Sequence, residues 1–136
     1  MKAMLPQSLD HVAIAVHRIA DHLPLYAKTL GMKHEGIYAF KAYGVRIASL
    51  KLKNARIELV EPMGPASVLA KFLAKRGEGI HHVAFRVDNL SGCVDTLKKK
   101  GLQWLNEKPR KGLHGSRICF LHPSGGKGVL LEFVEP

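Results

Sequence analysis

Cysteine, aromatic residues and long apolar runs are all scarce in this sequence of 136 residues. Its two cysteines, Cys93 and Cys119, form no CxxC pair, so the pattern of a disulfide framework or a cysteine-ligated zinc site is missing. No apolar run approaches the roughly 20 residues that a membrane-spanning helix needs. The opening MKAMLPQS also lacks the apolar core of a secretory signal. We therefore expect a chain that works in the reducing cytoplasm, without a membrane partner.

Acidic residues are also few, because 11 of them stand against 21 lysines and arginines, for a formal charge of +10. Such a balance is typical of many nucleic-acid-binding proteins. Here the basic residues are scattered, apart from Lys98–Lys100 and Lys108–Lys111, and aromatic residues make up only 7% of the chain. We therefore expect no nucleic-acid partner. The charge is typical either of a solvated basic surface or of a protein that binds a small polyanionic ligand, such as a phosphate-bearing thioester.

Alternating strand and helix patterns predict a single α+β domain over residues 1–136. In the first half, strands are predicted at Leu9–Val16, Met32–Phe40, Val45–Leu52 and Arg56–Glu61, with helices at Asp21–Leu30 and Ser67–Lys75. In the second half, strands are predicted at Ile80–Val87, Leu102–Leu105, Ser116–Leu121 and Val129–Val134, with a helix at Leu90–Lys100. Pro24 is expected in the first turn of its helix, where a missing N–H is tolerated.

The two halves of the chain repeat each other. The segment GVRIASL matches GSRICFL, and IELVEP matches the ending LEFVEP. A spacing of 71 residues separates His11 from His82, whereas 74 separate Glu58 from Glu132, because three extra residues fall in the HPSGGKG loop. Internal duplication of this kind indicates two paired modules, one at about residues 9–62 and one at about 80–136, each with the order βαβββ.

The repeat also pairs residues that can do chemistry. His11 and His82 each stand two residues before an alanine, so each imidazole shares a strand face with a small residue that leaves room for a ligand. Glu58 and Glu132 each interrupt a largely apolar strand late in their half. His81 competes with His82, but alternation assigns it to the other strand face. Two imidazoles and two carboxylates suit an octahedral first-row divalent ion, so these two histidines and two glutamates are the predicted metal ligands.

The motifs DHVAIAV, HHVAFRV, IELVEP and HPSGGKGVLLEFVEP resemble the vicinal oxygen chelate superfamily, and within it the methylmalonyl-CoA epimerase family. The resemblance runs from about Leu9 to the C-terminus. It implies two tandem βαβββ modules that form a curled mixed sheet around a metal site, with His11, Glu58, His82 and Glu132 as ligands. It also implies an isomerase that epimerises methylmalonyl-CoA at C2, by removing and returning a proton through a metal-stabilised enolate.

The same resemblance implies a divalent cofactor such as cobalt, manganese, nickel or zinc, and an acyl-CoA substrate. A homodimer is expected, since short βαβββ modules can pair across chains as well as within one. Glu132 is the first choice for one proton-transfer base, and Glu58 is the hypothesis for the other. The basic segment KPRKGLHGSR offers Arg110, Lys111 and Arg117 for contact with the phosphates of coenzyme A.

Two departures from the family pattern leave alternatives open. Many bacterial epimerases resemble this pattern with glutamine at the Glu58 position, so the glutamate makes the set more like glyoxalase I. Some epimerases carry a catalytic glutamate on the third strand, whereas Ala39–Leu52 contains no acid and Ile47 occupies that place. The identity of the second base is therefore open.

Three other functions compete with epimerisation. A glyoxalase I-like lactoylglutathione lyase is favoured by the two glutamates, and a ring-cleaving dioxygenase would leave Glu58 superfluous. A non-enzymatic resistance protein that binds a small molecule needs no metal, and four intact ligand positions argue against it.

Overall fold

The computed structural model describes residues 5–136 of the chain. The chain divides into two compact units. One is His11–His81, and the other joins the residues before His11 to His82–Pro136. Each unit has strands, a covering helix and a buried apolar cluster of its own.

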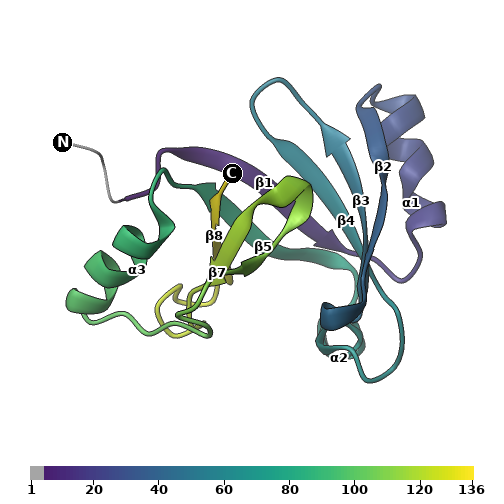
Figure 1. The fold of residues 1–136 in the computed structure, drawn as a ribbon. Helices are drawn as coiled ribbons and strands as arrows, with labels where there is room; N and C mark the ends of the chain where they lie inside the picture. Colours follow the sequence, from purple (N-terminus) through teal and green to yellow (C-terminus); the bar gives the residue numbers. More distant parts are fainter. Residues whose placement is uncertain (1–4) are drawn as a thin grey trace. The chain divides into compact units, whose positions relative to one another are not determined.

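The unit His11–His81 is built on four strands in the spatial order β2-β3-β4-β1. They are β1 (Ser8–Ala15), β2 (Lys33–Phe40), β3 (Val45–Lys51) and β4 (Arg56–Pro62), labelled in Figure 1. β1 and β4 run parallel, whereas β2 pairs antiparallel with β3, and β3 with β4. The helix α1 (Ile19–Pro24) lies between β1 and β2 in the chain. The predicted βαβββ order and mixed pairing are confirmed for this half.

The two faces of this sheet carry different apolar clusters. Apolar residues on the first face form one cluster with α1, which contacts β4: Val16, Ile19, Ala48, Leu50 and Leu59. Residues on the second face pack with α2 (Val68–Arg76): Ala13, Ala15, Val60, Leu69 and Leu73. Because strand side chains alternate between faces, His11 and Glu58 belong to the α2 face. α2 packs against Ala13, Ala15 and Val60, which follow His11 and Glu58 on the same strands. The helix therefore covers one end of this face and leaves room for polar groups at the other end.

The first helix begins two residues earlier than predicted, and this changes the role of its proline. Since α1 begins at Ile19, Pro24 is its sixth and last residue rather than part of the first turn. A proline at this depth has no N–H to donate to the preceding turn. The chain continues in a wider π-helical turn over Leu25–Thr29, closed where the Leu30 N–H donates to the Leu25 carbonyl.

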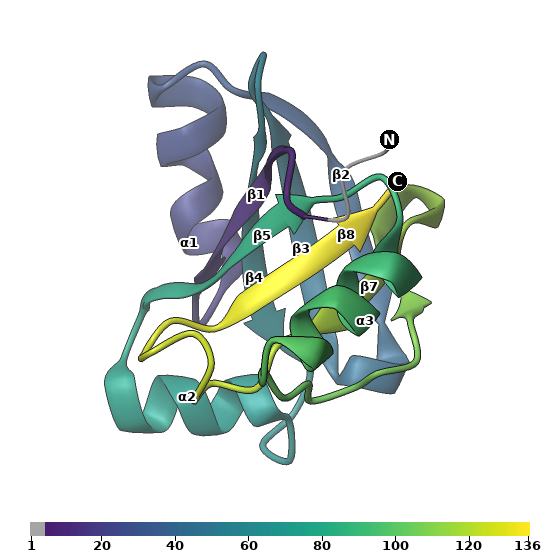
Figure 2. The same cartoon turned by 90° about the vertical axis from the view of Figure 1, so that its left-hand side faces the viewer.

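The other unit contains strands in the order β5-β8-β7-β6. Their bounds are β5 (Gly79–Arg86), β6 (Arg110–Lys111), β7 (Arg117–Phe120) and β8 (Leu131–Glu135). β5 and β8 are parallel, and β7 is antiparallel to both β8 and β6. The helix α3 (Leu90–Lys99) follows β5 and lies beside β8 and β7 in Figure 2. The Asn89 side chain caps it by accepting from the Gly92 N–H.

The second module departs from the prediction between Leu102 and Leu105. The expected strand is reduced to a single bridge, between Trp104 and Leu121. The cause is Asn106, whose side-chain oxygen accepts the Phe120 N–H at 3.0 Å and so takes a bond that a strand would have made. The chain resumes pairing only in the two residues of β6.

Among the residues that the structure describes, no helix combines the length and the apolar character needed to cross a lipid bilayer.

The cluster under α3 contains both cysteines, Cys93 from α3 and Cys119 from β7, each fully buried. Burial raises the pKa of each thiol from 9.0 to about 11. At pH 8 we expect both thiols of the native protein to resist Ellman's reagent and to react in 6 M guanidinium. Rapid reaction of both native thiols would contradict this burial.

The raised thiol pKa values also predict a pH dependence of stability. The fold favours the neutral thiol, so stability is intact below pH 9 and falls as the pH rises toward 11, by on the order of 1 kcal/mol per thiol. Urea unfolding at pH 8 and pH 10 measures the loss. The Cys93→Ala/Cys119→Ala double variant is the control, and its stability should fall less over this range.

Candidate functional site

The first imidazole–carboxylate pair lies on two parallel strands of the unit His11–His81. The β1–β4 register sets Ala13 opposite Glu58 and His11 opposite Arg56. His11 and Glu58 therefore share one face and sit diagonally across the strand pair. His11 Nδ1 lies 3.3 Å from Glu58 Oε2, and each residue is only 5% exposed.

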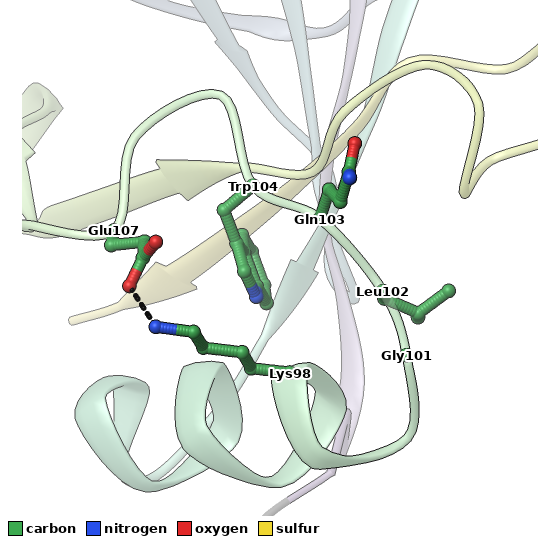
Figure 3. Close-up of a pocket in the computed structure, with 6 residues that line it drawn as sticks. All are labelled: Lys98, Gly101, Leu102, Gln103, Trp104 and Glu107. Carbon is green, nitrogen blue, oxygen red and sulfur yellow. Dashed lines mark hydrogen bonds and ion pairs between the residues drawn. The ribbon is translucent and has the colours of Figure 1, made fainter.

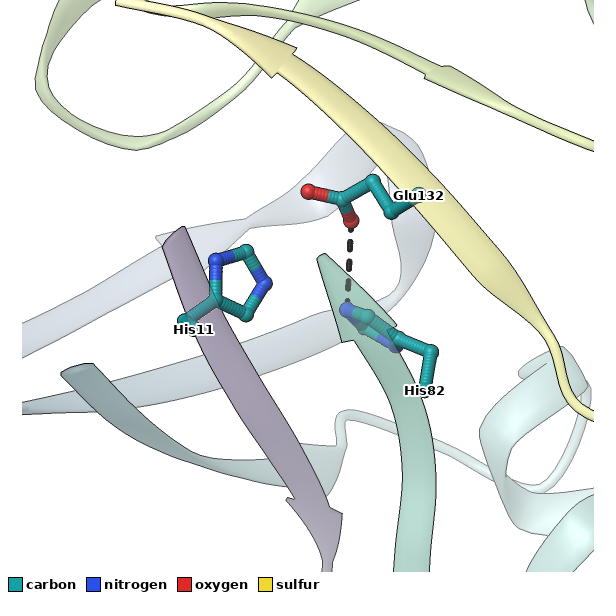
Figure 4. Close-up of side chains that lie close together, drawn as sticks. All are labelled: His11, His82 and Glu132. Carbon is teal, nitrogen blue, oxygen red and sulfur yellow. Dashed lines mark ion pairs between the residues drawn. The ribbon is translucent and has the colours of Figure 1, made fainter. Parts of the chain in front are cut away.

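The second pair repeats this arrangement in the other unit. β5 and β8 are parallel, and their register sets Ala84 opposite Glu132. His82 Nε2 lies 3.1 Å from Glu132 Oε1, and the two residues are 7% and 4% exposed. Figure 4 shows the Glu132 carboxylate on β8 pointing toward the His82 ring on β5. The edge of the His82 ring also meets Phe120, with ring centroids 5.2 Å apart.

The structure therefore brings each predicted histidine together with the predicted glutamate of its own half. In both cases an alanine stands across the ladder from the glutamate, so a small side chain leaves space beside the two polar groups. Alternation of strand side chains gives this result from the sequence alone.

Burial makes these pairs difficult to explain as stabilising elements. Withdrawing a carboxylate from water costs several kcal/mol, and a buried ion pair recovers this only with excellent geometry and further hydrogen bonds. Buried imidazole and carboxylate groups are also donors that first-row divalent cations accept. The described residues thus include buried histidine and carboxylate groups that could hold a metal ion.

Other histidines have separate, local partners. The His81 ring packs edge-on against Phe72 of α2, with centroids 4.8 Å apart, on the opposite side of β5 from His82. His22 Nε2 lies 2.8 Å from Glu78, whose carboxylate also accepts the His17 N–H. These hydrogen bonds lower the pKa of Glu78.

One acidic residue near the first pair was not singled out from the sequence. Glu35 on β2 accepts a hydrogen bond from Ser49 Oγ at 3.0 Å and one from Arg56 Nε at 2.8 Å. Ser49 is directly opposite Glu58 in the β3–β4 register. The poor alternation of β2 hid this residue, because a β-bulge falls between His34 and Gly36.

The predicted substrate-contact residues lie on the short ladder of β6 and β7. Lys111 is directly opposite Arg117, and Arg110 is opposite Ile118. Arg117 is exposed and reaches Glu135 at 3.3 Å.

A shallow hollow of about 440 Å³ lies between the end of α3 and the segment after it, shown in Figure 3. Its rim carries an ion pair between Lys98 and Glu107 at 2.8 Å, and the buried Trp104 Nε1 has no hydrogen-bond partner there. Trp104 packs against the apolar cluster under α3. The hollow is therefore on the helix-covered side of the sheet, whereas His82 and Glu132 are on the other side.

The sequence matches a family model described as the Glyoxalase/Bleomycin resistance protein/Dioxygenase superfamily over residues 10–120. It is 38% identical to the mitochondrial methylmalonyl-CoA epimerase of Homo sapiens, over 93% of this chain and 73% of that protein. It is 36% identical to the ethylmalonyl-CoA/methylmalonyl-CoA epimerase of Cereibacter sphaeroides, over 93% of this chain and 96% of that one.

The structure is similar to that of a Streptomyces coelicolor methylmalonyl-CoA epimerase variant in complex with 2-nitronate-propionyl-CoA, with a TM-score of 0.92 and 35% identity. This likeness covers 96% of the present chain and 95% of the other. It therefore extends over residues of both units.

The buried pair His11–Glu58 generates a prediction for stability. Replacing Glu58 by Ala leaves the imidazole buried without this carboxylate, at an expected cost of about 1–3 kcal/mol in metal-free buffer. Arg46→Ala is the matched control, because Arg46 pairs with Glu61 on the opposite sheet face and is half exposed. It should cost at most about 1 kcal/mol. Urea unfolding in EDTA compares the two, and equal effects would contradict the burial argument.

Proposed function

Because this chain belongs to the glyoxalase/bleomycin resistance protein/dioxygenase superfamily, and within it to the methylmalonyl-CoA epimerases, we propose that it epimerises methylmalonyl-CoA at C2. The observation that carries this proposal is the duplicated, buried histidine–glutamate pair, set within a chain that resembles the epimerases over nearly its whole length. The relatives named for this activity support the choice of substrate.

We propose further that His11, Glu58, His82 and Glu132 hold one divalent cation. Three facts support this: the donors are mixed nitrogen and oxygen, all four are at least nine-tenths buried, and the repeat relates them in pairs. Cobalt, manganese, nickel and zinc all accept this donor set. When bound, the cation supplies positive charge for the oxygens of an enolate.

The chain's own residues would carry the proton. The C2–H bond of the substrate lies between a thioester and a carboxylate, which makes it acidic, and inversion needs a proton-transfer group on each face of C2. Glu132 is proposed for one face. Glu58, beside His11, is the candidate that the sequence offers for the other face.

The basic ladder is proposed to hold the coenzyme A portion of the substrate. Arg110, Lys111 and Arg117 lie within one short strand pair, so three positively charged side chains could meet the phosphate groups. A homodimer is also proposed, because short βαβββ modules can pair across chains as well as within one chain. Two free, buried cysteines are consistent with the cytoplasm as the proposed compartment.

A glyoxalase I-like lactoylglutathione lyase is the second candidate, because the set contains two glutamates rather than one. A non-enzymatic binding protein is disfavoured, since it has no need to bury four ligand-type residues.

The metal proposal predicts opposite results for two adjacent histidines. The His82→Ala variant should lose its bound metal, and its epimerase activity should fall at least about 100-fold, because the proposed ligands hold the ion directly. His81→Ala is the matched control, because His81 packs on Phe72. This variant should keep both its metal and its activity. Elemental analysis of the purified proteins gives the metal content. Equal metal content in the two variants would reject His82 as a ligand.

The substrate proposal is tested with two assays on the same preparation. The wild-type protein should interconvert the two epimers of methylmalonyl-CoA, followed by a coupled mutase assay. It should give no S-lactoylglutathione from methylglyoxal and glutathione. Removing the metal with a chelator should abolish the first activity, and adding back Co²⁺ should restore it. Lyase activity without epimerase activity would establish the second candidate instead.

A further inference from the structure

A bulge in β2 re-aims one acidic side chain. The β2–β3 register pairs His34 with Leu50 and Gly36 with Ser49, so Glu35 is the extra residue between two pairs on β3. Gly36 has φ of +130°, a conformation that favours glycine, and a Cβ there would meet the Tyr38 hydroxyl at 3.3 Å. The Tyr38 hydroxyl donates to the Glu35 carbonyl at 3.1 Å. Bulges of this kind redirect a side chain next to functional sites.

The redirected carboxylate lies on the same sheet face as the first histidine–glutamate pair. Its Oε1 accepts from Ser49 Oγ at 3.0 Å and from Arg56 Nε at 2.8 Å. Ser49 is fully buried and directly opposite Glu58, and Arg56 is two residues before Glu58 on β4. All of these side chains therefore share one face. Two donors on one oxygen fix the orientation of the carboxylate.

The other acidic residues of this unit are elsewhere. Glu61 is on the α1 face, where it pairs with Arg46 and accepts the Ile19 N–H. Glu78 is tied to His17 and His22, and Asp21 is exposed on α1. β3 itself contributes no acid, because Val45–Lys51 has none. Apart from Glu58, Glu35 is thus the one carboxylate of His11–His81 on the face of the proposed site.

We propose that Glu35, rather than Glu58, is the proton-transfer base for the second face of C2. This rests on the proposed epimerase function. The Glu35 carboxylate takes the C2 proton as the C–H bond breaks, and the bonding electron pair moves into the thioester to form an enolate. A carboxylic acid on the opposite face, proposed as Glu132, gives its proton to C2. The reverse reaction exchanges the two roles, so no oxidant or further reactant is needed.

This assignment separates two tasks, metal binding and proton transfer, that were both predicted for Glu58 from its position in the repeat. Glu58 faces His11 at 3.3 Å and is 5% exposed, which suits a ligand. The Glu35 side chain is more exposed, at 18%, and its contacts with Ser49 and Arg56 lie on the other side of Glu58 from β1. A base must reach the substrate, and of the two carboxylates on this sheet face Glu35 is the more accessible, since Glu58 already faces His11.

The test follows epimerisation and C2–H exchange separately, starting from each pure enantiomer of methylmalonyl-CoA in D₂O with the metal-loaded protein. Glu35→Gln keeps an oxygen to accept from Ser49 and Arg56 but cannot take a proton. It should interconvert the epimers at least about 100-fold more slowly. One enantiomer should still exchange its C2 proton with retention at a near wild-type rate, and the other should not exchange.

Two further variants keep the test decisive. Glu35→Asp retains the charge beside Arg56 and should give partial interconversion with the same one-sided bias. Glu61→Gln removes the matching charge from the opposite face of the same sheet and should leave both rates unchanged. Glu58→Gln should retain exchange of both enantiomers.

Three results would overturn the assignment. The first is unchanged interconversion of the epimers by folded Glu35→Gln. The second is an equal loss of C2–H exchange from both enantiomers in that variant. The third is one-sided exchange in Glu58→Gln instead, which would make Glu58 the base. A wild-type protein that neither epimerises nor exchanges the substrate would reject the proposed function, and this assignment with it.

Discussion

Each buried imidazole–carboxylate pair depends on the parallel pairing of the first and last strands of its module. In each unit the helix that follows the first strand allows the last strand of the module to return beside it in the same direction. That topology sets the glutamate of the last strand diagonally across from the histidine of the first. The separation of 3.1–3.3 Å between ring nitrogen and carboxylate oxygen is a consequence of sheet register, repeated in both halves.

The polar groups are possible because each sheet also carries an apolar cluster on the face away from its histidine. α1 covers the first sheet with Ile19 and its neighbours, and α3 covers the second with Leu90 and Cys93. Each sheet therefore gains its burial energy without filling the face that holds the histidine. The alanines next to the histidines and opposite the glutamates keep that face open.

Regular features were predictable from the sequence, and irregular ones were not. Alternation in β1 and β5 correctly placed His11 and His82, and the internal repeat correctly gave the βαβββ order. The missed features are local exceptions to periodicity: Pro24 inside α1, Asn106 taking a ladder bond, and the bulge at Glu35. The Asn106 bond depends on a residue distant in the chain and the bulge depends on a positive φ, and neither leaves a period in the sequence.

The bulge in β2 has a consequence for how relatives of this chain are compared. Inserting one residue shifts the phase of a strand, so a carboxylate can emerge on a face that simple counting would assign to its neighbour. Column-by-column comparison would record Ile47 as the loss of an acidic group. Comparison of positions in space would find an acidic group, that of Glu35, on the neighbouring strand. The chemistry of such enzymes is therefore better compared by the positions of side-chain atoms than by aligned residue types.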